Sequence, residues 1–338
     1  MTAETTKKNP VGLVDRFGRR ITYLRLSVTD RCNFRCVYCM GPSQRLTPRN
    51  RLLEPDEIAR IARTFTDLGV RKIRLTGGEP LVRRDILRLM GEISALPRLD
   101  ELVITTNGSR LRELAGPVRA AGVKRINISL DTLWPERFRR ITRQGDLDAV
   151  LRGIDAARAA GFERIKLNVV ILKHRNHDES LDLVQFAVDK GINISFIEEM
   201  PIGRIGDHDR AETFYPSDAI RADLQPRFTL IPTTETTGGP ARYYRIPDTE
   251  TRVGFISPHS HNFCGDCNRV RVTAEGWLLT CLGQEQTLDL RRILRGHPGD
   301  TTRLGRAIRD AMQHKPQGHE FGPGANRVLL RHMNVMGG

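Results

Sequence analysis

The sequence predicts an α/β fold, namely a partial, TIM-like (β/α)6 barrel closed by a smaller C-terminal region that carries a second metal site. Two observations lead to this prediction. Between residues 23 and 199, six short runs of β-type composition alternate with stretches of helical period. The six cysteines of the chain fall into two triplets, one directly after the first β-type run and one far beyond the last.

The alternation of the two kinds of run defines six β/α units. In the first helical stretch Ile58, Ile61, Phe65 and Leu68 share one face, as Val150, Leu151 and Ile154 do in a later stretch. Six units suit a partial, open barrel better than a closed barrel of eight. The predicted strands are Tyr23–Val28, Lys72–Thr76, Glu101–Thr106, Arg125–Leu130, Arg164–Leu172 and Asn193–Glu198.

Three motifs follow the first three predicted strands. They are Cys32 to Cys39, then Gly77-Gly78-Glu79, then Thr105 to Gly108. Because binding sites of such barrels lie at the carboxyl ends of the strands, the motifs are expected to share one rim. Glycines 77 and 78 would let the backbone approach a ligand without a Cβ in between.

The pattern changes after residue 200. The segment Thr233–Pro240 is rich in Thr, Gly and Pro and predicts a loop or linker. Beyond it we expect two short strands and two helices, at about 287–295 and 301–313. The predicted domains are an N-terminal extension (1–22), the barrel (23–230) and the C-terminal region (231–338).

Composition limits the function classes. The 338 residues are 39% hydrophobic and 28% charged, as in a globular protein, and the net charge of +14 favours an anionic partner such as a nucleotide. No apolar run has the length of a membrane span, and the first ten residues lack the apolar core of a signal peptide. We therefore expect a cytoplasmic protein that does not bind a membrane.

The first triplet consists of Cys32, Cys36 and Cys39. Three thiolates this close can converge on one metal centre, and thiolates suit zinc or an iron–sulfur cluster. A zinc site would need a fourth ligand such as histidine, but the first 170 residues contain none. Three cysteines on a four-iron cluster leave one iron able to bind a small molecule.

The second triplet consists of Cys264, Cys267 and Cys281. His259 and His261 lie just upstream, so spacing alone leaves a Cys3His zinc site and an iron–sulfur cluster about equally favoured. The three-thiolate site elsewhere in the chain favours a second cluster.

The first triplet, with Tyr38 before its last cysteine, resembles the signature of the radical S-adenosylmethionine (SAM) enzymes, and Gly77 to Pro80 resembles their GGEP motif. A closer resemblance, from about Leu13 to Gly338, is to the GTP 3′,8-cyclases of molybdenum cofactor biosynthesis. It rests on Leu13-x-Asp15-x-Phe17-Gly18-Arg19, on residues 263–271 with Cys281, and on the final Gly-Gly. Gly41 before Pro42 departs from the family's usual pattern.

This resemblance implies two [4Fe-4S] clusters, one on each triplet. It implies that SAM bound at the first cluster yields a 5′-deoxyadenosyl radical that abstracts H3′ of GTP. The new C3′ radical then attacks C8, and a further electron and proton complete the product, (8S)-3′,8-cyclo-7,8-dihydroguanosine 5′-triphosphate. The resemblance assigns SAM contacts to Tyr38, Gly78, Ser129 and Met200. It assigns GTP contacts to Arg25, Arg74, Thr105, Lys166, Arg269, Val270 and Arg271.

The same resemblance brings the tail glycines Gly337 and Gly338 to the active site and implies no side chain that acts as acid or base. It also implies a homodimer, an external electron donor and a downstream partner, the cyclic pyranopterin monophosphate synthase.

Two other classes of function are weighed against this cyclase. An RNA-modifying radical enzyme would explain the positive charge, but aromatic residues are only 6% and no RNA-binding module is recognisable. A non-enzymatic metal or electron-transfer protein would not consume SAM.

Overall fold

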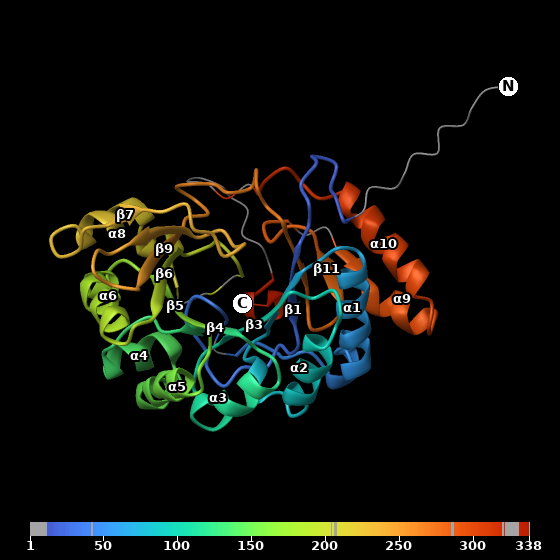
Figure 1. The fold of residues 1–338 in the computed structure, drawn as a ribbon, viewed down its shortest axis with the longest axis horizontal. Helices are drawn as coiled ribbons and strands as arrows, with labels where there is room; N and C mark the ends of the chain where they lie inside the picture. The colour runs from blue at the N-terminus through green and yellow to red at the C-terminus, as the bar shows by residue number, and fades with distance from the viewer. Residues whose placement is uncertain are drawn as a thin grey trace.

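A parallel sheet organises the molecule (Figure 1). The structure, a computed structural model, describes residues 12–41, 43–203, 205, 208–284, 287–319, 321 and 331–337. Within these residues the strand order is β12-β11-β10-β1-β2-β3-β4-β5-β6-β9-β8-β7. The run from β10 to β9 is parallel, and antiparallel strands extend it at both ends. The strands are β1 (Tyr23–Ser27), β2 (Lys72–Thr76), β3 (Glu101–Thr106), β4 (Arg125–Ser129), β5 (Arg164–Ile171), β6 (Asn193–Glu198), β7 (Ile231–Pro232), β8 (Arg242–Arg245), β9 (Arg252–Ile256), β10 (Arg269–Val272), β11 (Trp277–Leu279) and β12 (Thr287–Asp289).

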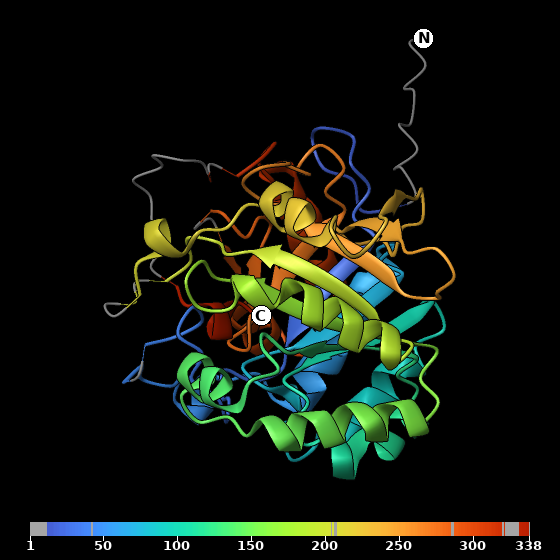
Figure 2. The same cartoon turned by 90° about the vertical axis from the view of Figure 1, so that its left-hand side faces the viewer.

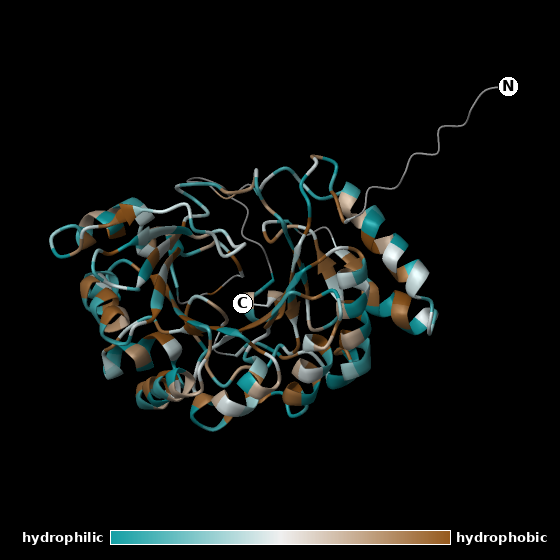
Figure 3. Cartoon of the chain, in the orientation of Figure 1, coloured by the Kyte–Doolittle hydropathy of each residue, from teal (hydrophilic) through white to brown (hydrophobic). Residues whose placement is uncertain are grey.

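Helices cover the outer side of the curved sheet, and the two views of Figures 1 and 2 agree on this arrangement. Hydrophobic and hydrophilic residues alternate along these helices (Figure 3), as expected for helices with one buried face. The helices are α1 (Pro55–Asp67), α2 (Ile86–Ser94), α3 (Leu111–Ala120), α4 (Pro135–Thr142), α5 (Leu147–Ala159), α6 (Ser180–Asp189), α7 (Arg210–Thr213), α8 (Ser217–Leu224), α9 (Leu290–Gly296), α10 (Thr301–Gln313) and α11 (Met333–Met336), with short 3-10 helices at Arg49–Arg51, Pro80–Val82 and His177–Glu179.

Helix α1 illustrates how local sequence sets an element. Pro55 stands in its first turn, and Glu54 and Glu57 form a reciprocal capping box that satisfies the first backbone N–H groups. The chain leaves the helix through Gly69, whose φ of 103° favours glycine. Ile58, Ile61 and Phe65 are fully buried, which confirms the face predicted from their spacing.

The strands separate an apolar outer layer from a polar interior. In β1, Leu24 and Leu26 point into the layer beneath the helices, whereas Tyr23 and Arg25 line the central cavity. This division follows from the two-residue period of a strand. The barrel therefore has a hydrophobic core between sheet and helices and a polar interior inside the sheet.

The predicted six β/α units are present, with strand bounds that agree to within a residue. The prediction for the C-terminal region is wrong in one respect, because β8 to β12 lie beyond residue 240 where two strands were expected. Two of them continue the barrel sheet: β10 pairs with β1 and β9 pairs with β6, both in parallel. Residues 287–289 form β12 rather than the start of a helix, and α9 begins only at Leu290.

No helix of the described residues combines the length and the apolar character needed to cross a bilayer.

Candidate functional site

One cavity of about 320 Å³ occupies the inside of the barrel, and both cysteine triplets line it. The first triplet reaches it from the loop after β1, and the second from the segment before β10 and the end of β11. The predicted contacts Arg25, Tyr38, Arg74, Gly78, Thr105, Ser129, Lys166, Met200, Arg269, Val270 and Arg271 line the same cavity. Residues separated by more than two hundred positions are thus brought to one space.

Strand register arranges the polar side chains in rows. Arg271, Arg25 and Arg74 are paired across β10, β1 and β2. A second row places Asn127 between Thr105 and Lys166 across β3, β4 and β5. Because paired residues of parallel strands point to the same face, each row projects into the cavity as a group.

The loop of the first triplet is held by the backbone that follows β2. The Gly78 N–H donates to the Thr29 carbonyl at 2.7 Å, and the Glu79 N–H donates to the Arg31 carbonyl at 2.7 Å. A Cβ on Gly78 would lie 2.3 Å from the Arg31 oxygen. Glycine is therefore required for contact with the cysteine loop itself, a reason that the sequence alone did not indicate.

Glu79 ties this loop to the end of β3. Its buried carboxylate accepts from the Thr106 hydroxyl at 2.7 Å and from the backbone N–H groups of Asn107 at 2.6 Å and Leu81 at 2.9 Å. Burial raises its pKa to about 7, although these three donors and Arg110 lower it. The three motifs predicted to share one rim are thereby bonded to one another.

Tyr38 has a defined partner. Its hydroxyl donates to the Asp131 carboxylate at 2.6 Å, and Asp131 also accepts from the Val170 N–H at 2.8 Å. Burial raises the pKa of Asp131 to about 6, while both hydrogen bonds lower it. This pair fixes the orientation of the Tyr38 side chain, which lies between Cys36 and Cys39 in the sequence.

The thiols of the first triplet lie in an apolar setting. Burial raises the pKa of Cys32 to about 11 and that of Cys39 to about 12, and it raises the pKa of Cys36 well above its usual value. The neighbouring thiols contribute in the same direction at Cys36 and Cys39. The Asn107 side-chain amide lies 3.9 Å from Cys32 Sγ. These thiols become thiolates only with a strong counter-charge, which a bound metal centre supplies.

The thiols of the second triplet lie among cations. At Cys267 burial raises the pKa, but Lys315, Arg269 and Arg19 outweigh it, so the pKa is lowered. Burial raises the pKa of Cys281, which Lys315 partly offsets.

The histidines that a zinc site would require bond elsewhere. His259 Nε2 lies 2.9 Å from the Glu199 carbonyl, and His261 Nε2 lies 2.9 Å from the Asp218 carboxylate. Among the described residues no three Cys, His, Asp or Glu side chains are grouped closely enough to bind a single metal ion. A Cys3His site that uses His259 or His261 therefore has no support from this geometry.

The cationic part of the cavity is formed by Arg25, Arg74, Lys166, Arg269 and Arg271. Burial, together with the charges of Arg25 and Arg269, lowers the pKa of Arg271 well below its usual value. Burial likewise lowers the pKa of Lys166, whose ammonium donates to the Tyr243 hydroxyl at 3.2 Å. Cations that are this crowded and buried favour an anionic ligand.

Tyr23 lies in the middle of these cations, and its hydroxyl accepts a hydrogen bond from Arg74 Nε. Burial raises its pKa, but the charges of Arg74, Arg25 and Lys72 outweigh burial and lower the pKa to about 7. Arg74 also donates to the Thr105 hydroxyl at 3.0 Å.

The C-terminal tail reaches the cavity cations. Arg25 Nη2 donates to the Gly337 carbonyl at 3.1 Å, and Arg271 Nη1 donates to the same oxygen at 3.3 Å. Helix α11, which precedes Gly337, lies inside the curve of the sheet in Figure 1. Gly338 lies outside the described residues, so its predicted role stays a prediction.

Sequence reasoning missed several residues of this site. Tyr23 lies two positions before Arg25 on the same strand face, so strand periodicity could have found it. Asp131 and Lys315 gave no local signal, because each reaches the cavity only through the tertiary fold. The same holds for Tyr243, which lies outside the cavity lining and contacts Lys166.

Comparison with known proteins identifies the two parts of the chain. The family description "Radical SAM superfamily" matches residues 26–187, and "Molybdenum Cofactor Synthesis C" matches residues 192–321. The GTP 3′,8-cyclase of Pseudomonas entomophila is 59% identical over 98% of this chain and 100% of its own length. That of Ectopseudomonas mendocina is 57% identical over 96% of this chain and 98% of its own length.

Solved structures agree on the fold. The crystal structure of Streptococcus suis SuiB bound to S-adenosylmethionine superimposes with a TM-score of 0.61 at 15% sequence identity, over 85% of this chain and 67% of SuiB. At this identity the likeness concerns the fold, an α/β radical SAM architecture with a mostly parallel sheet. Together with the near-complete sequence matches, it establishes that the chain belongs to the GTP 3′,8-cyclases, radical SAM enzymes of molybdenum cofactor biosynthesis.

Proposed function

We propose that this chain converts GTP to (8S)-3′,8-cyclo-7,8-dihydroguanosine 5′-triphosphate, the first step of molybdenum cofactor biosynthesis, with SAM bound at the first cysteine triplet and GTP bound towards the second. One observation carries the proposal, namely that both triplets and five cations line a single cavity. A reaction in which a radical from one ligand abstracts hydrogen from the other needs both ligands in one enclosed space.

The donor set of the first triplet fits a [4Fe-4S] cluster. Three thiols on one loop suit three irons, and each ligand of a cubane binds a different iron, so no convergence on a single ion is needed. When bound there, a reduced cluster together with SAM supplies a 5′-deoxyadenosyl radical, the reagent that an unactivated ribose C–H bond requires. Tyr38, Gly78, Ser129 and Met200 would orient the SAM molecule, since all four line the cavity.

The row Arg271, Arg25 and Arg74 would bind the triphosphate, assisted by Arg269 and Lys166. Guanidinium groups match phosphate oxygens with paired hydrogen bonds. The four guanidinium groups and the Lys166 ammonium face about four negative charges of GTP. Thr105, bonded to Arg74, and the backbone at Val270 complete this set. The role of these residues is to place the ribose and to exclude water, and no side chain needs to act as acid or base.

The second triplet would hold a second [4Fe-4S] cluster whose open iron binds the guanine. Support comes from its three thiols on the cavity wall and from the engagement of His259 and His261 with other partners. Anchoring the base there and the triphosphate at the arginines would fix C8 relative to C3′.

Other partners follow from the proposed reaction. It consumes one electron to cleave SAM and a second, with a proton, to reduce the radical left by ring closure, so an external electron donor must deliver both. Its product passes to the cyclic pyranopterin monophosphate synthase. We also propose a homodimer in the cytoplasm, with neither nucleic acid nor membrane as a partner.

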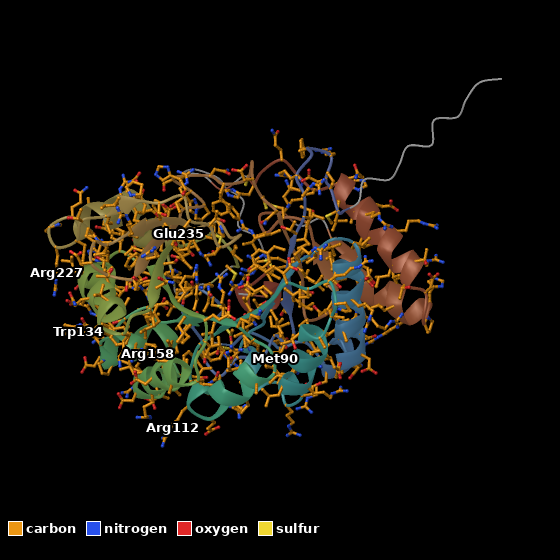
Figure 4. All side chains as sticks on the ribbon, in the orientation of Figure 1. Met90, Arg112, Trp134, Arg158, Arg227 and Glu235 are labelled. Carbon is orange, nitrogen blue, oxygen red and sulfur yellow. The ribbon has the colours of Figure 1, made fainter. Side chains whose placement is uncertain are left out.

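A small-molecule substrate agrees with the distribution of charge better than RNA does. The cations that are buried together face the interior cavity. In contrast, exposed arginines such as Arg112, Arg158 and Arg227 extend from different outer segments (Figure 4).

The test is anaerobic incubation of the reconstituted protein with SAM, a reductant and each nucleoside triphosphate in turn. We expect 5′-deoxyadenosine together with a cyclised purine for GTP alone. Cleavage of SAM with GTP left unchanged would refute the proposed substrate. Turnover of RNA oligonucleotides in the same assay would replace it by the RNA-modifying alternative.

A further inference from the structure

Lys315, which follows α10, is buried without a role in the proposed reaction. Its side chain is among the largest fully buried ones, with 2% of the residue exposed, and it lines the wall of the cavity beside the second triplet. A buried ammonium is costly unless acceptors replace its lost water. The acceptors around Lys315 therefore indicate what the residue is for.

Three acceptors match the three N–H groups of the ammonium. Lys315 Nζ donates to the Thr280 carbonyl at 2.6 Å and to the Arg269 carbonyl at 3.0 Å, and it lies 3.6 Å from Cys267 Sγ. Thr280 immediately precedes Cys281, and Arg269 lies two residues after Cys267. The lysine thus joins the two chain segments that carry these cysteines.

These contacts lie at the open end of a hairpin. Strands β10 and β11 pair through Arg271 with Leu279 and through Val272 with Leu278, and Arg271–Leu279 is the pair nearest the cysteines. Arg269 and Thr280 lie beyond the last of these pairs, where β10 is still paired with β1 through Arg269 and Tyr23 but no longer with β11. The ammonium bridges them at this point and fixes the distance between Cys267 and Cys281.

The segment after Lys315 secures the third cysteine. Arg19 donates to the Cys264 carbonyl at 2.7 Å, to the Gln317 carbonyl at 2.7 Å and to the Pro316 carbonyl at 2.5 Å. The Asp15 carboxylate in turn accepts a hydrogen bond from Arg19 Nε at 2.6 Å. The N-terminal motif singled out in the sequence thereby locks the Lys315 segment against Cys264.

The positive charge of Lys315, like its hydrogen bonds, indicates a role at the second cysteine triplet. Three thiolates on a buried cluster concentrate negative charge, and a buried charge is tolerated when it is paired. Lys315 is the buried cation in contact with one of these sulfur atoms. The bonds of Lys315 to neutral carbonyls leave its positive charge available to the thiolates.

We propose that Lys315 is a positioning residue of the second cysteine site, which bridges the Cys267 and Cys281 segments and supplies positive charge beside their thiolates. It is needed for the second cluster and hence for cyclisation of GTP, but not for the first cluster. This inference rests on the proposed function, which assigns a cluster to these three thiols.

The experiment compares wild type, Lys315→Met and Lys315→Gln after anaerobic reconstitution. Met removes charge and donors at similar length, whereas Gln removes the charge and keeps N–H donors. Lys124→Met, at an exposed lysine before β4, is the matched control. Bound iron, the electron paramagnetic resonance spectrum, the reduction potential of the second cluster and formation of 5′-deoxyadenosine without GTP are measured.

We expect iron in Lys315→Met to fall from about eight to about four per chain, with SAM cleavage within about twofold of wild type. Lys315→Gln should retain more iron but show a more negative potential of the second cluster, because reduction adds charge that the lysine no longer offsets. The control should match wild type in all four measurements.

Two other results would overturn the inference. One is Lys315→Met with wild-type iron, spectrum and potential, which would leave the proposed function intact. The other is loss of SAM cleavage in both Lys315 variants, which would assign the lysine to the whole fold. Only about four irons in the wild type would instead refute the second cluster of the proposed function.

Discussion

The two cysteine triplets line the same cavity but are built in different ways. Cys32, Cys36 and Cys39 lie on one loop, and burial raises the pKa of all three thiols. In the second triplet Cys281 joins the other two from a different strand end, and nearby cations lower the pKa of Cys267. The ligands of the first site are neighbours in sequence, on one loop that Gly78 and Glu79 hold in place, whereas the ligands of the second come from two chain segments that Lys315 bridges.

The difference in the charges around the two triplets indicates how much counter-charge each site needs from its bound metal centre. The first site, whose thiols are kept neutral by burial, depends on the bound centre for most of its counter-charge, although Arg35 lowers the pKa of Cys32 and Cys39. A site flanked by Lys315, Arg269 and Arg19 carries part of that charge in the protein. The three predictions below test whether this contrast extends to function.

The largest effect is expected from replacing one cysteine of each triplet. Cys36→Ser should reduce formation of 5′-deoxyadenosine to background, and cyclisation with it, because SAM loses its cluster. Cys267→Ser should abolish cyclisation of GTP while SAM cleavage persists, because only the second site is damaged. Chromatography of both products measures the two activities, and each variant serves as control for the other.

Wild-type cyclisation in Cys267→Ser would show that the second triplet is not part of the active site. Loss of SAM cleavage in that variant would show that the two sites depend on each other, contrary to the comparison.

A smaller effect on cyclisation is expected from a substitution in the C-terminal tail, where Gly337 contacts Arg25 and Arg271. Gly337 has a φ of 84°, and an added Cβ would lie 2.6 Å from Thr76 Oγ1. Gly337→Ala should therefore displace the carbonyl that Arg25 and Arg271 contact. A side chain in this conformation costs about 1–2 kcal/mol, so cyclisation should fall roughly tenfold, with SAM cleavage retained.

The matched control is Gly91→Ala in α2, where no atom lies within 4 Å of the added Cβ. Equal turnover by both alanine variants would mean that the contact of the tail with the cations has no role in catalysis.

The smallest effect concerns Tyr23, which faces the cations next to the second site. Its pKa is lowered to about 7 in the folded protein from a usual value of 10. The phenolate therefore stabilises the fold in full above pH 10, and this contribution is lost as the pH falls through 7. The melting temperature of wild type relative to Tyr23→Phe should rise between pH 6 and pH 9.

Tyr215→Phe is the control for this measurement. The pKa of Tyr215 is raised to about 12 by burial and by Asp223, so this tyrosine stays protonated over the same pH range. Its substitution should change stability by an amount that does not depend on pH. A Tyr23→Phe difference that is equally flat would show that the cations do not ionise the phenol.

The barrel could be predicted from sequence because its information is local. Each of the six strands has a run long enough to show its period, and α1 carries its own capping box and closing glycine. Beyond residue 240 two short strands were expected and β8 to β12 are present; β10 and β11 have four and three residues, too few to show a period. The pairing of β10 with β1 depends on a partner far away in the chain.

In the candidate site, too, some residues could be recognised from the sequence and others only from the structure. The cysteines and the glycines at 77 and 78 were recognisable from spacing, and resemblance supplied Arg25, Arg74 and Lys166. The reason for Gly78 was visible only in the structure, where its N–H bonds the Thr29 carbonyl. No sequence pattern indicated that Glu79 would be bonded to Thr106 and Asn107.

The sequence by itself determined the six repeating units, the first metal-binding loop and the family, because ligand spacing and strand period are properties of neighbouring residues. Only the tertiary structure decided that Lys315 would join Cys267 to the Cys281 segment, and that Gly337 would meet Arg25 and Arg271. These contacts depend on strand register and on chain segments that meet only when the sheet is complete. The second site therefore depends on the whole fold, whereas one loop defines the first.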